Sequence, residues 1–340
     1  MRSIARERLV RQRLAGGKLA GPGQVVRWMG AVQAQDVPAA LWAVAQRTRA
    51  PRRDAVLRAL DRGDIVRTWP MRRTLHLVPA EDAAWMLARL APRLLRGNAG
   101  RYRALGLGMR DIDRGRSVLR RALRGGGRTT RPAAYATLER RGVSPRGQRG
   151  IHILAHLAME GTLCLGPLEG ARSTFVLLEE WVPRPAPPPT DPLAELARRY
   201  LRSHAPASDR DFAWWAGVSL TDARAALARV APPRPARPAP QGRAHLLSAF
   251  DELLVAYQDR APSLARIPPR KVPPAAGLLS PTLALDGQVV GLWTRTLAGA
   301  TVKVACKPLV PLDAAEREAL ARAAAGYARF LGADLDLRGV

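Results

Sequence analysis

The sequence contains little cysteine, little lysine and no long apolar run. Its two cysteines, Cys164 and Cys306, stand alone, so they fit neither a disulfide framework nor a zinc site with paired ligands, and we interpret both as reduced packing residues. Residues 1–13 alternate charged and apolar side chains, unlike a signal peptide, and nowhere do about eighteen apolar residues follow one another. These absences predict a cytoplasmic protein without a membrane partner.

Acidic residues are also scarce. The chain has 28 Asp and Glu against 55 Lys and Arg, which gives a formal net charge of +27. Such an excess attracts phosphate backbones through counterion release, so nucleic acid is the expected partner and association with the nucleoid is the expected location. A GC-rich coding bias would also raise arginine and is consistent with the presence of only four lysines, but it does not explain why acidic residues fail to rise in step.

The first third of the chain has the pattern of a winged helix. Its 340 residues, 47% of them hydrophobic, are enough for two or three domains. Helical spacing predicts helices over 3–14, 24–33 and 53–60, with a further helix start at Asp36 before Pro38. Residues 64–78 then alternate as a basic-tipped β-hairpin with a turn at 70–72. Helices followed by such a hairpin are typical of winged-helix modules.

This pattern recurs along the chain. Two predicted helices over 129–141 and 149–161 precede short apolar runs, a proline-rich linker covers 183–192, and residues 193–230 have the spacing of a third helix-turn-helix. Asp286-Gly287 predicts a β-hairpin, and 313–331 an amphipathic final helix. We therefore predict an α+β, mostly helical fold of tandem winged-helix modules with a C-terminal β-rich region and a closing helix. The expected divisions are 1–125, 126–182, 183–240 and 241–340.

Familiar catalytic patterns are poorly represented. His152 and His156 have the i,i+4 spacing of metal ligands but lack a third ligand nearby, so a surface or packing pair is favoured. The glycines at 125–127 lack the lysine of a phosphate-binding loop. Asp251 and Glu252 are adjacent and should point in different directions, which argues against a paired-carboxylate site. We expect no metal and no cofactor.

Gln33-Ala34-Gln35 is the most informative segment. Two glutamines one residue apart point to the same side of an extended backbone, but the pattern alone favours solvated glutamines at a helix end. In its context the segment closely resembles the AlkZ-type winged-helix DNA glycosylases, whose hallmark is a Gln-x-Gln motif in the first module. The resemblance covers nearly the whole chain and also rests on Trp42, the hairpin at 66–78, Ala249-Phe250-Asp251-Glu252 with Tyr257 and Asp259-Arg260, and residues 286–293. Residues 273–277 depart from it, since a more polar glycine/asparagine loop is expected there.

The resemblance implies a monofunctional DNA glycosylase that acts on double-stranded DNA carrying alkylated bases. A purine alkylated at N7 is cationic and leaves without protonation, so no strong general acid is required. Gln33 and Gln35 are the expected catalytic residues, which would jointly hold the attacking water and face the developing positive charge. Interstrand crosslinks joined through N7 are possible substrates. The alternative is a non-catalytic winged-helix regulator or architectural DNA binder, and no obligatory protein partner is evident.

The predicted hairpin supplies the expected DNA contacts. Arg67, Arg72 and Arg73 flank its tip and are candidates for phosphate binding, against the alternative of an ordinary solvated basic turn. His76 alternates with Thr74 and Val78 on one strand face, where it either packs or approaches DNA. The four lysines lie far in sequence from Gln33 and Gln35, so we expect no Schiff-base nucleophile and no strand cleavage.

Overall fold

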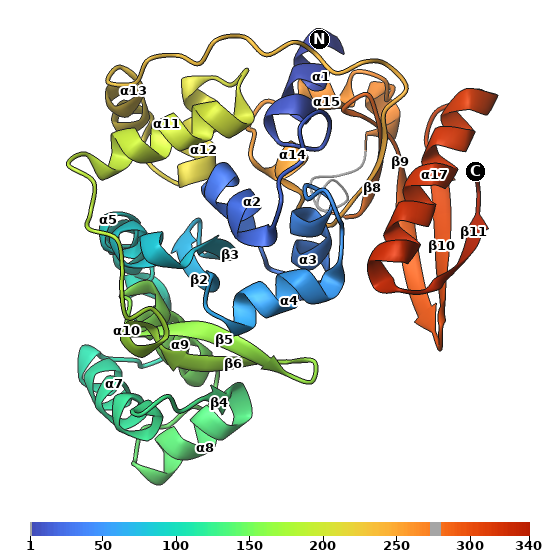
Figure 1. Cartoon of the computed structure of the whole chain (residues 1–340). Coiled ribbons are helices and arrows are strands. Elements are labelled where there is room, and N and C mark those ends of the chain that lie inside the picture. Colours follow the sequence, from blue (N-terminus) through green and yellow to red (C-terminus); the bar gives the residue numbers. More distant parts are fainter. Residues whose placement is uncertain (1, 273–279) are drawn as a thin grey trace. The chain divides into compact units, whose positions relative to one another are not determined.

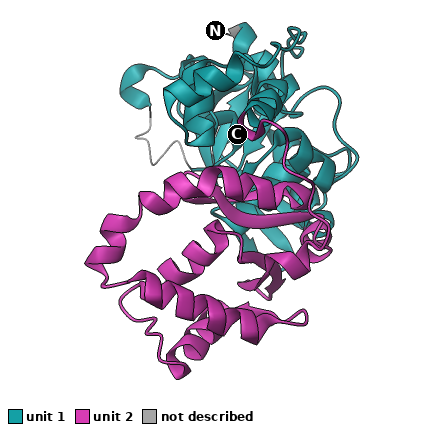
Figure 2. Ribbon diagram, turned by 90° about the vertical axis from the view of Figure 1, so that its left-hand side faces the viewer, with its two compact units in different colours: residues 1–56, 194–340 teal, residues 57–193 magenta. Residues whose placement is uncertain are grey.

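The computed structural model describes residues 2–272 and 280–340, so the sequence departure noted at 273–277 lies outside the described part. The chain divides into two compact units, one made of residues 1–56 and 194–340 and the other of residues 57–193 (Figure 2). The predicted α+β, mostly helical fold is confirmed, while the four-part division of the chain stays a prediction.

Unit 1 begins with α1 (Arg2–Arg11), α2 (Pro22–Met29), the short strand β1 (Val32–Gln33) and α3 (Val37–Ala45) (Figure 1). The prediction that a helix runs to residue 33 is wrong in its last turn. Gly30 adopts a φ of 80°, which favours glycine, and its N–H bonds to the carbonyl of Val26, so the helix ends there. The predicted helix start at Asp36 is confirmed, because its carboxylate accepts a 2.8 Å hydrogen bond from the Ala39 N–H.

Three helices after the linker form the predicted helix-turn-helix of unit 1. They are α11 (Pro192–His204), α12 (Asp209–Ala216) and α13 (Leu220–Leu227). Ser208 caps α12 by accepting from the Asp211 N–H, and Gly217, with φ 67°, ends the helix as a left-handed C-terminal cap. Ser219 caps α13 in the same way as Ser208 caps α12. Local capping chemistry therefore sets both ends of α12 and fixes the turn.

The C-terminal part of unit 1 is a five-stranded sheet with the strand order β11-β10-β9-β8-β7. Asp286 and Gly287, both at positive φ, form the predicted turn between β8 and β9. The final helix α17 (Ala314–Leu331) packs against this sheet, as Figure 1 shows for its strands β10 and β11. The other elements here are β7 (Ala244–Leu247), α14 (Glu252–Val255), α15 (Ala261–Leu264), η2 (Pro269–Lys271), β8 (Thr282–Leu285), β9 (Gln288–Ala298), β10 (Thr301–Pro308) and β11 (Asp334–Arg338).

Unit 2 joins two hairpins in one sheet, with its strands in the order β3-β2-β5-β6-β4. The hairpins meet where Arg67 of β2 pairs with Leu165 of β5. The elements are α4 (Arg53–Asp61), which crosses the boundary between the units, β2 (Ile65–Met71), β3 (Thr74–Pro79), η1 (Ala80–Asp82), α5 (Ala83–Arg96), α6 (Ala99–Ala104), α7 (Met109–Leu123), β4 (Thr129–Thr130), α8 (Arg131–Arg140), α9 (Arg149–Met159), β5 (Leu163–Glu169), β6 (Arg172–Leu177) and α10 (Leu178–Trp181). Among the described helices, none is long and apolar enough to cross a membrane.

The order helix, strand, helix, helix, strand, strand occurs twice along the chain, from α2 to β3 and from α7 to β6. This is the element order of a winged helix. The first hairpin turns later than expected, because β2 continues through Met71 and the turn residues are Arg72 and Arg73. Both have positive φ, 54° and 58°, as a two-residue type I′ turn requires.

Candidate active site

The Gln33-Ala34-Gln35 motif leads from the interior of unit 1 to its surface. Gln33 ends β1 and is 8% exposed, Ala34 is fully buried, and Gln35 lies exposed in the bend that precedes α3. The extended backbone expected for the first glutamine is present. Asp36 then caps α3. The motif therefore leads from the last residue of β1 to the capped start of α3.

A buried carboxylate holds the backbone of the motif. The Gln33 N–H donates a 2.7 Å hydrogen bond to Oε1 of Glu252, which is fully buried in the first turn of α14. The other oxygen, Oε2, accepts from the Trp215 indole at 3.2 Å and lies 3.7 Å from His204 Nε2. Charge-assisted hydrogen bonds of this kind are roughly twice as strong as neutral ones. Glu252 therefore ties the position of Gln33 to the core of unit 1.

The neighbouring carboxylate, Asp251, serves a different set of residues. Arg47 donates to both of its oxygens, at 2.8 and 3.0 Å, and Gln46 donates to one of them at 3.0 Å. Arg47 also donates to the carbonyl and the side-chain oxygen of Gln12, and Gln12 in turn donates to the Glu252 carbonyl. The two adjacent carboxylates therefore diverge, as expected, and join the segments that follow α1 and α3 to the start of α14 in one buried polar network.

Aromatic residues surround the Glu252 side chain. Tyr200 stacks on His204 with ring centroids 4.7 Å apart, and Trp215 lies 5.1 Å from Tyr200. Burial lowers the pKa of His204 below its ordinary value, so this imidazole is neutral at neutral pH. Burial likewise raises the pKa of Tyr257, whose hydroxyl donates to the His204 carbonyl at 2.8 Å. The carboxylate is thus stabilised by hydrogen bonds within a low-dielectric cluster.

A small aromatic cavity of about 180 Å³ lies beside the motif, and Asp36, the residue after Gln35, is part of its lining. Trp42, Trp293 and Tyr327 form its wall, with ring centroids 5.1 Å apart for Trp42 and Tyr327 and 4.9 Å for Trp293 and Tyr327. The indoles of both tryptophans donate to backbone carbonyls, which fixes their orientation. Asp36 and Ser248 also line the cavity, and the buried Ser248 hydroxyl has no hydrogen-bond partner within the described residues.

The four predicted DNA-binding residues lie in the first hairpin of unit 2. Arg67 is buried, and its guanidinium donates to the Ser173 hydroxyl at 2.9 Å. His76 is fully buried, with Nδ1 2.9 Å from the Thr74 carbonyl and Nε2 3.0 Å from an Arg72 guanidinium nitrogen. Arg73 is exposed at the turn. The hairpin tip, rather than the strand position of Arg67, therefore carries the more accessible positive charge.

The other candidate residues from the sequence are accounted for by burial or by hydrogen bonds within the protein. His156 is buried, bonds to the Tyr102 hydroxyl at 3.0 Å and has a pKa lowered by burial. The Gly125 and Gly126 N–H groups donate to the Glu180 carboxylate. Burial raises the pKa of Cys164 to about 12. Lys18 donates to the Gln46 carbonyl, and burial lowers its pKa to about 8.

Sequence patterns did not reveal the residues that support the motif. Glu252 lies 219 residues from Gln33, and Arg47 lies 204 residues from Asp251. No local period links such positions, and a pair of adjacent carboxylates normally indicates a solvated surface. The one available signal was the Ala249-Phe250-Asp251-Glu252 segment within the family resemblance.

Similarity to known proteins shows that this chain is a DNA glycosylase, an enzyme that hydrolyses N-glycosyl bonds in DNA repair. The family model described as "DNA glycosylase AlkZ-like" matches residues 26–330, so the chain belongs to the AlkZ-like DNA glycosylases. It is similar to the "Interstrand DNA cross-link repair glycosylase" of Streptomyces sahachiroi, with 28% identity over 334 residues and coverage of 86% of this chain and 87% of that protein. The solved structure of Streptomyces sahachiroi DNA glycosylase AlkZ is also similar, with a TM-score of 0.76, 26% identity, and coverage of 99% of this chain and 98% of that one.

Proposed function

We propose that the protein releases cationic N7-alkylated purines from double-stranded DNA, with Gln33 and Gln35 as the catalytic residues. The observation that carries this proposal is the anchored Gln-x-Gln motif, in which Glu252 fixes the backbone of Gln33 and Gln35 reaches the surface. A cationic purine takes the electrons of the glycosidic bond without protonation, so the protein has only to stabilise the sugar cation and supply water. Two amide oxygens can accept from a water molecule and orient their dipoles toward positive charge.

Fixed geometry is what makes such weak groups effective. Amide dipoles stabilise a transition state only when they are already oriented, because reorganisation would cost free energy at the moment of reaction. The anchored β1 and the capped start of α3 restrict the backbone on both sides of the motif. The aromatic cavity that follows Gln35 supports the proposal further, since planar bases pack against aromatic rings.

Crosslinked DNA is part of the proposal. The relative from Streptomyces sahachiroi is named as an interstrand cross-link repair glycosylase. A crosslink joined through N7 of a purine carries the same positive charge as a simple N7 adduct, so the same chemistry would release one of its ends. We therefore propose that this protein also unhooks crosslinks of that type.

Base release can be measured directly. A duplex with one N7-methylguanine is incubated with the protein in single turnover, and free N7-methylguanine and abasic sites are quantified. A second duplex, crosslinked through N7 of two guanines, is scored for strand separation under denaturing conditions. Release that is strongly slowed by each of Gln33→Ala and Gln35→Ala supports the proposal. Tight duplex binding without release from either substrate would instead support a DNA-binding protein with no activity on these lesions.

A further inference from the structure

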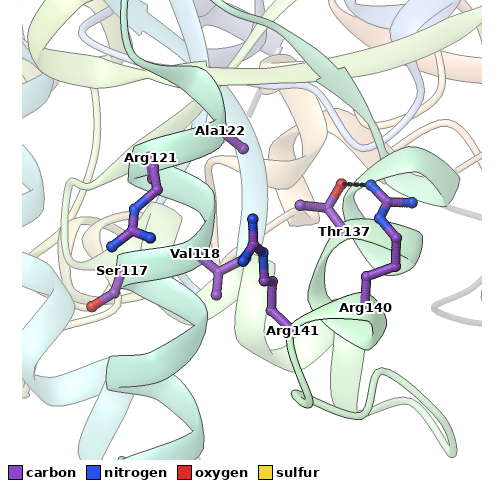
Figure 3. A pocket seen from close by; sticks show the side chains of 7 residues that line it. All are labelled: Ser117, Val118, Arg121, Ala122, Thr137, Arg140 and Arg141. Carbon is purple, nitrogen blue, oxygen red and sulfur yellow. Dashed lines mark hydrogen bonds between the residues drawn. The ribbon is translucent and has the colours of Figure 1, made fainter.

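Helices α7 and α8 of unit 2 enclose a cavity of about 360 Å³. Ser117, Val118 and Arg121 line it from α7, while Thr137, Arg140 and Arg141 line it from α8 and the residue that follows (Figure 3). We call this cavity the α7–α8 groove. Its residues are outside α9 and the β5–β6 hairpin, the elements with which a winged helix ordinarily contacts DNA.

Close packing holds the two helices beside the groove. The buried stripe of α7 includes Ile112, Gly115 and Leu119, and the groove residues occupy positions next to this stripe. A Cβ added at Gly115 would lie 2.9 Å from Ile153 of α9 and 3.6 Å from Leu138 of α8. The absence of a side chain at this position therefore lets α7 approach both helices, and the groove lies on helices that a packed core holds together.

The positive charge of the groove is not neutralised by the neighbouring carboxylates. Each of the three acidic residues on α7 and α8 pairs with an arginine that does not line the groove. The pairs are Asp111 with Arg149, Asp113 with Arg116 and Glu139 with Arg146. Within residues 2–272 and 280–340, the side chains of Arg121 and Arg141 make no hydrogen bond or ion pair. Guanidinium groups gathered without a counter-charge repel one another, and an oxyanion removes that repulsion.

The arrangement of the side chains suits a phosphate group. In the view of Figure 3 the Arg141 guanidinium lies between those of Arg121 and Arg140, and Arg140 is held by a 3.1 Å hydrogen bond to the Thr137 hydroxyl. Guanidinium presents its N–H donors in a planar fork that matches two phosphate oxygens. The Ser117 and Thr137 hydroxyls add polar atoms on either wall.

We propose that the α7–α8 groove binds a phosphodiester group of duplex DNA, as a contact separate from those of α9 and the hairpins. The proposal rests on duplex DNA being the substrate, and it is independent of which lesion is released. DNA is favoured over a small phosphate compound because the groove residues Arg121, Arg140 and Arg141 are all exposed, and an open basic surface can receive a continuous backbone.

The test compares two double variants that remove equal charge. Arg121→Gln/Arg141→Gln alters the groove, and Arg317→Gln/Arg322→Gln alters exposed arginines of α17 in unit 1. Affinity for an undamaged duplex is measured between 50 and 200 mM salt. We expect the groove variant to bind about tenfold more weakly at low salt and to lower the slope of the log–log salt plot by about 1 to 2, as loss of one or two phosphate contacts predicts.

The α17 variant should retain nearly the wild-type affinity and slope. Equal losses in the two double variants would overturn the proposal, because they would reflect net charge alone. Thermal unfolding of both variants, expected near wild type for exposed substitutions, verifies that folding does not explain a difference. Inorganic pyrophosphate serves as the probe for a small-anion site. If the groove variant loses pyrophosphate binding but keeps full duplex binding, the DNA assignment is wrong.

Base release distinguishes this proposal from the proposed function. At saturating protein the groove variant should release N7-methylguanine at the wild-type rate, since a phosphate contact that is equally strong in ground and transition states changes binding only. If the wild-type protein releases no base, the lesion assignment fails while the salt experiment on undamaged duplex still decides the role of the groove.

Discussion

Replacing Glu252 with glutamine tests whether the buried carboxylate positions the catalytic motif. Both carboxylate oxygens accept hydrogen bonds, Oε1 from the Gln33 N–H at 2.7 Å and Oε2 from the Trp215 indole at 3.2 Å. A glutamine of the same shape offers one carbonyl and one NH₂ group. Whichever way the amide is turned, its NH₂ group faces a donor, so one of the two hydrogen bonds is lost.

The structure sets the size of the effect. A buried charge-assisted hydrogen bond is worth about 1.5–3 kcal/mol, and the donor left without an acceptor adds a penalty, so Glu252→Gln should lower the free energy of unfolding by about 2–4 kcal/mol. The backbone of Gln33 then loses its acceptor or shifts to find another. Since a 1 Å misplacement of a catalytic group can cost about a hundredfold in rate, we expect base release to slow by about tenfold to a hundredfold.

Asp251→Asn is the matched control. This neighbouring carboxylate is equally buried, but it binds Arg47 and Gln46 instead of the motif. Removing one partner of a buried ion pair costs about 3–5 kcal/mol, so the control is at least as destabilised as Glu252→Gln while the anchor of Gln33 is retained.

The assay is single-turnover release of N7-methylguanine at saturating protein, at a temperature where circular dichroism shows every variant folded. Duplex affinity is measured in parallel and should change little for both variants, because neither carboxylate is assigned to phosphate binding. Wild-type release by Glu252→Gln, or an equal loss of rate in the folded Asp251→Asn variant, would refute the positioning role.

The remaining predictions concern the motif, the chemistry and the pH range of stability. Gln33→Ala and Gln35→Ala should each slow release by about a hundredfold, with duplex affinity nearly intact. The double variant should be less than additive in single-turnover rates, because loss of either amide would already misplace the shared water of the proposed mechanism. Release should persist in excess chelator, and a loss restored by zinc would contradict that expectation. Borohydride should trap no covalent protein–DNA adduct, because no amine is assigned as nucleophile. Burial lowers the pKa of His245 from 6.5 to about 4, so the unfolded chain binds more protons in this interval and stability falls as the pH drops through it. The resulting loss, about 2 kcal/mol between pH 7.5 and pH 5, should appear in urea unfolding midpoints and shrink in His245→Asn.

The parts of the fold that sequence predicted well are those set by local chemistry. Asp286-Gly287 placed a hairpin, and the Asp36 cap placed the start of α3, because both depend on residues within one turn. The hairpin turn was expected at 70–72, because Pro70 suggested it. It lies at Arg72 and Arg73, and arginine rarely adopts the positive φ that these positions have. The helix was expected to run to residue 33, but it ends at Met29 because Gly30 is its C-terminal cap.

The supporting structure of the site could not be predicted in this way. Glu252 was assigned no role, because its function depends on β1, α11 and α12 meeting around one side chain. Arg47 similarly lies in the turn after α3, where nothing local distinguishes it from a solvated arginine, yet it is fully buried. Such residues are identified only when the partners that offset the cost of burying a charge are known.

Under the two proposals above, the exposed arginines serve DNA binding and the buried Glu252 serves the chemistry. Arg73 at the hairpin tip and the arginines of the α7–α8 groove are exposed, where they can replace the counterions of a phosphate backbone. Of the two acceptor carboxylates beside the motif, that of Glu252 is turned inward and fully buried, whereas that of Asp36 is exposed where it caps α3. Glu252 holds the backbone of Gln33, and under the proposed function the neutral amides of the motif meet a substrate that is already cationic. A reaction whose leaving group needs no proton can rely on fixed dipoles, provided that the protein holds them still, and the buried anchor meets that requirement.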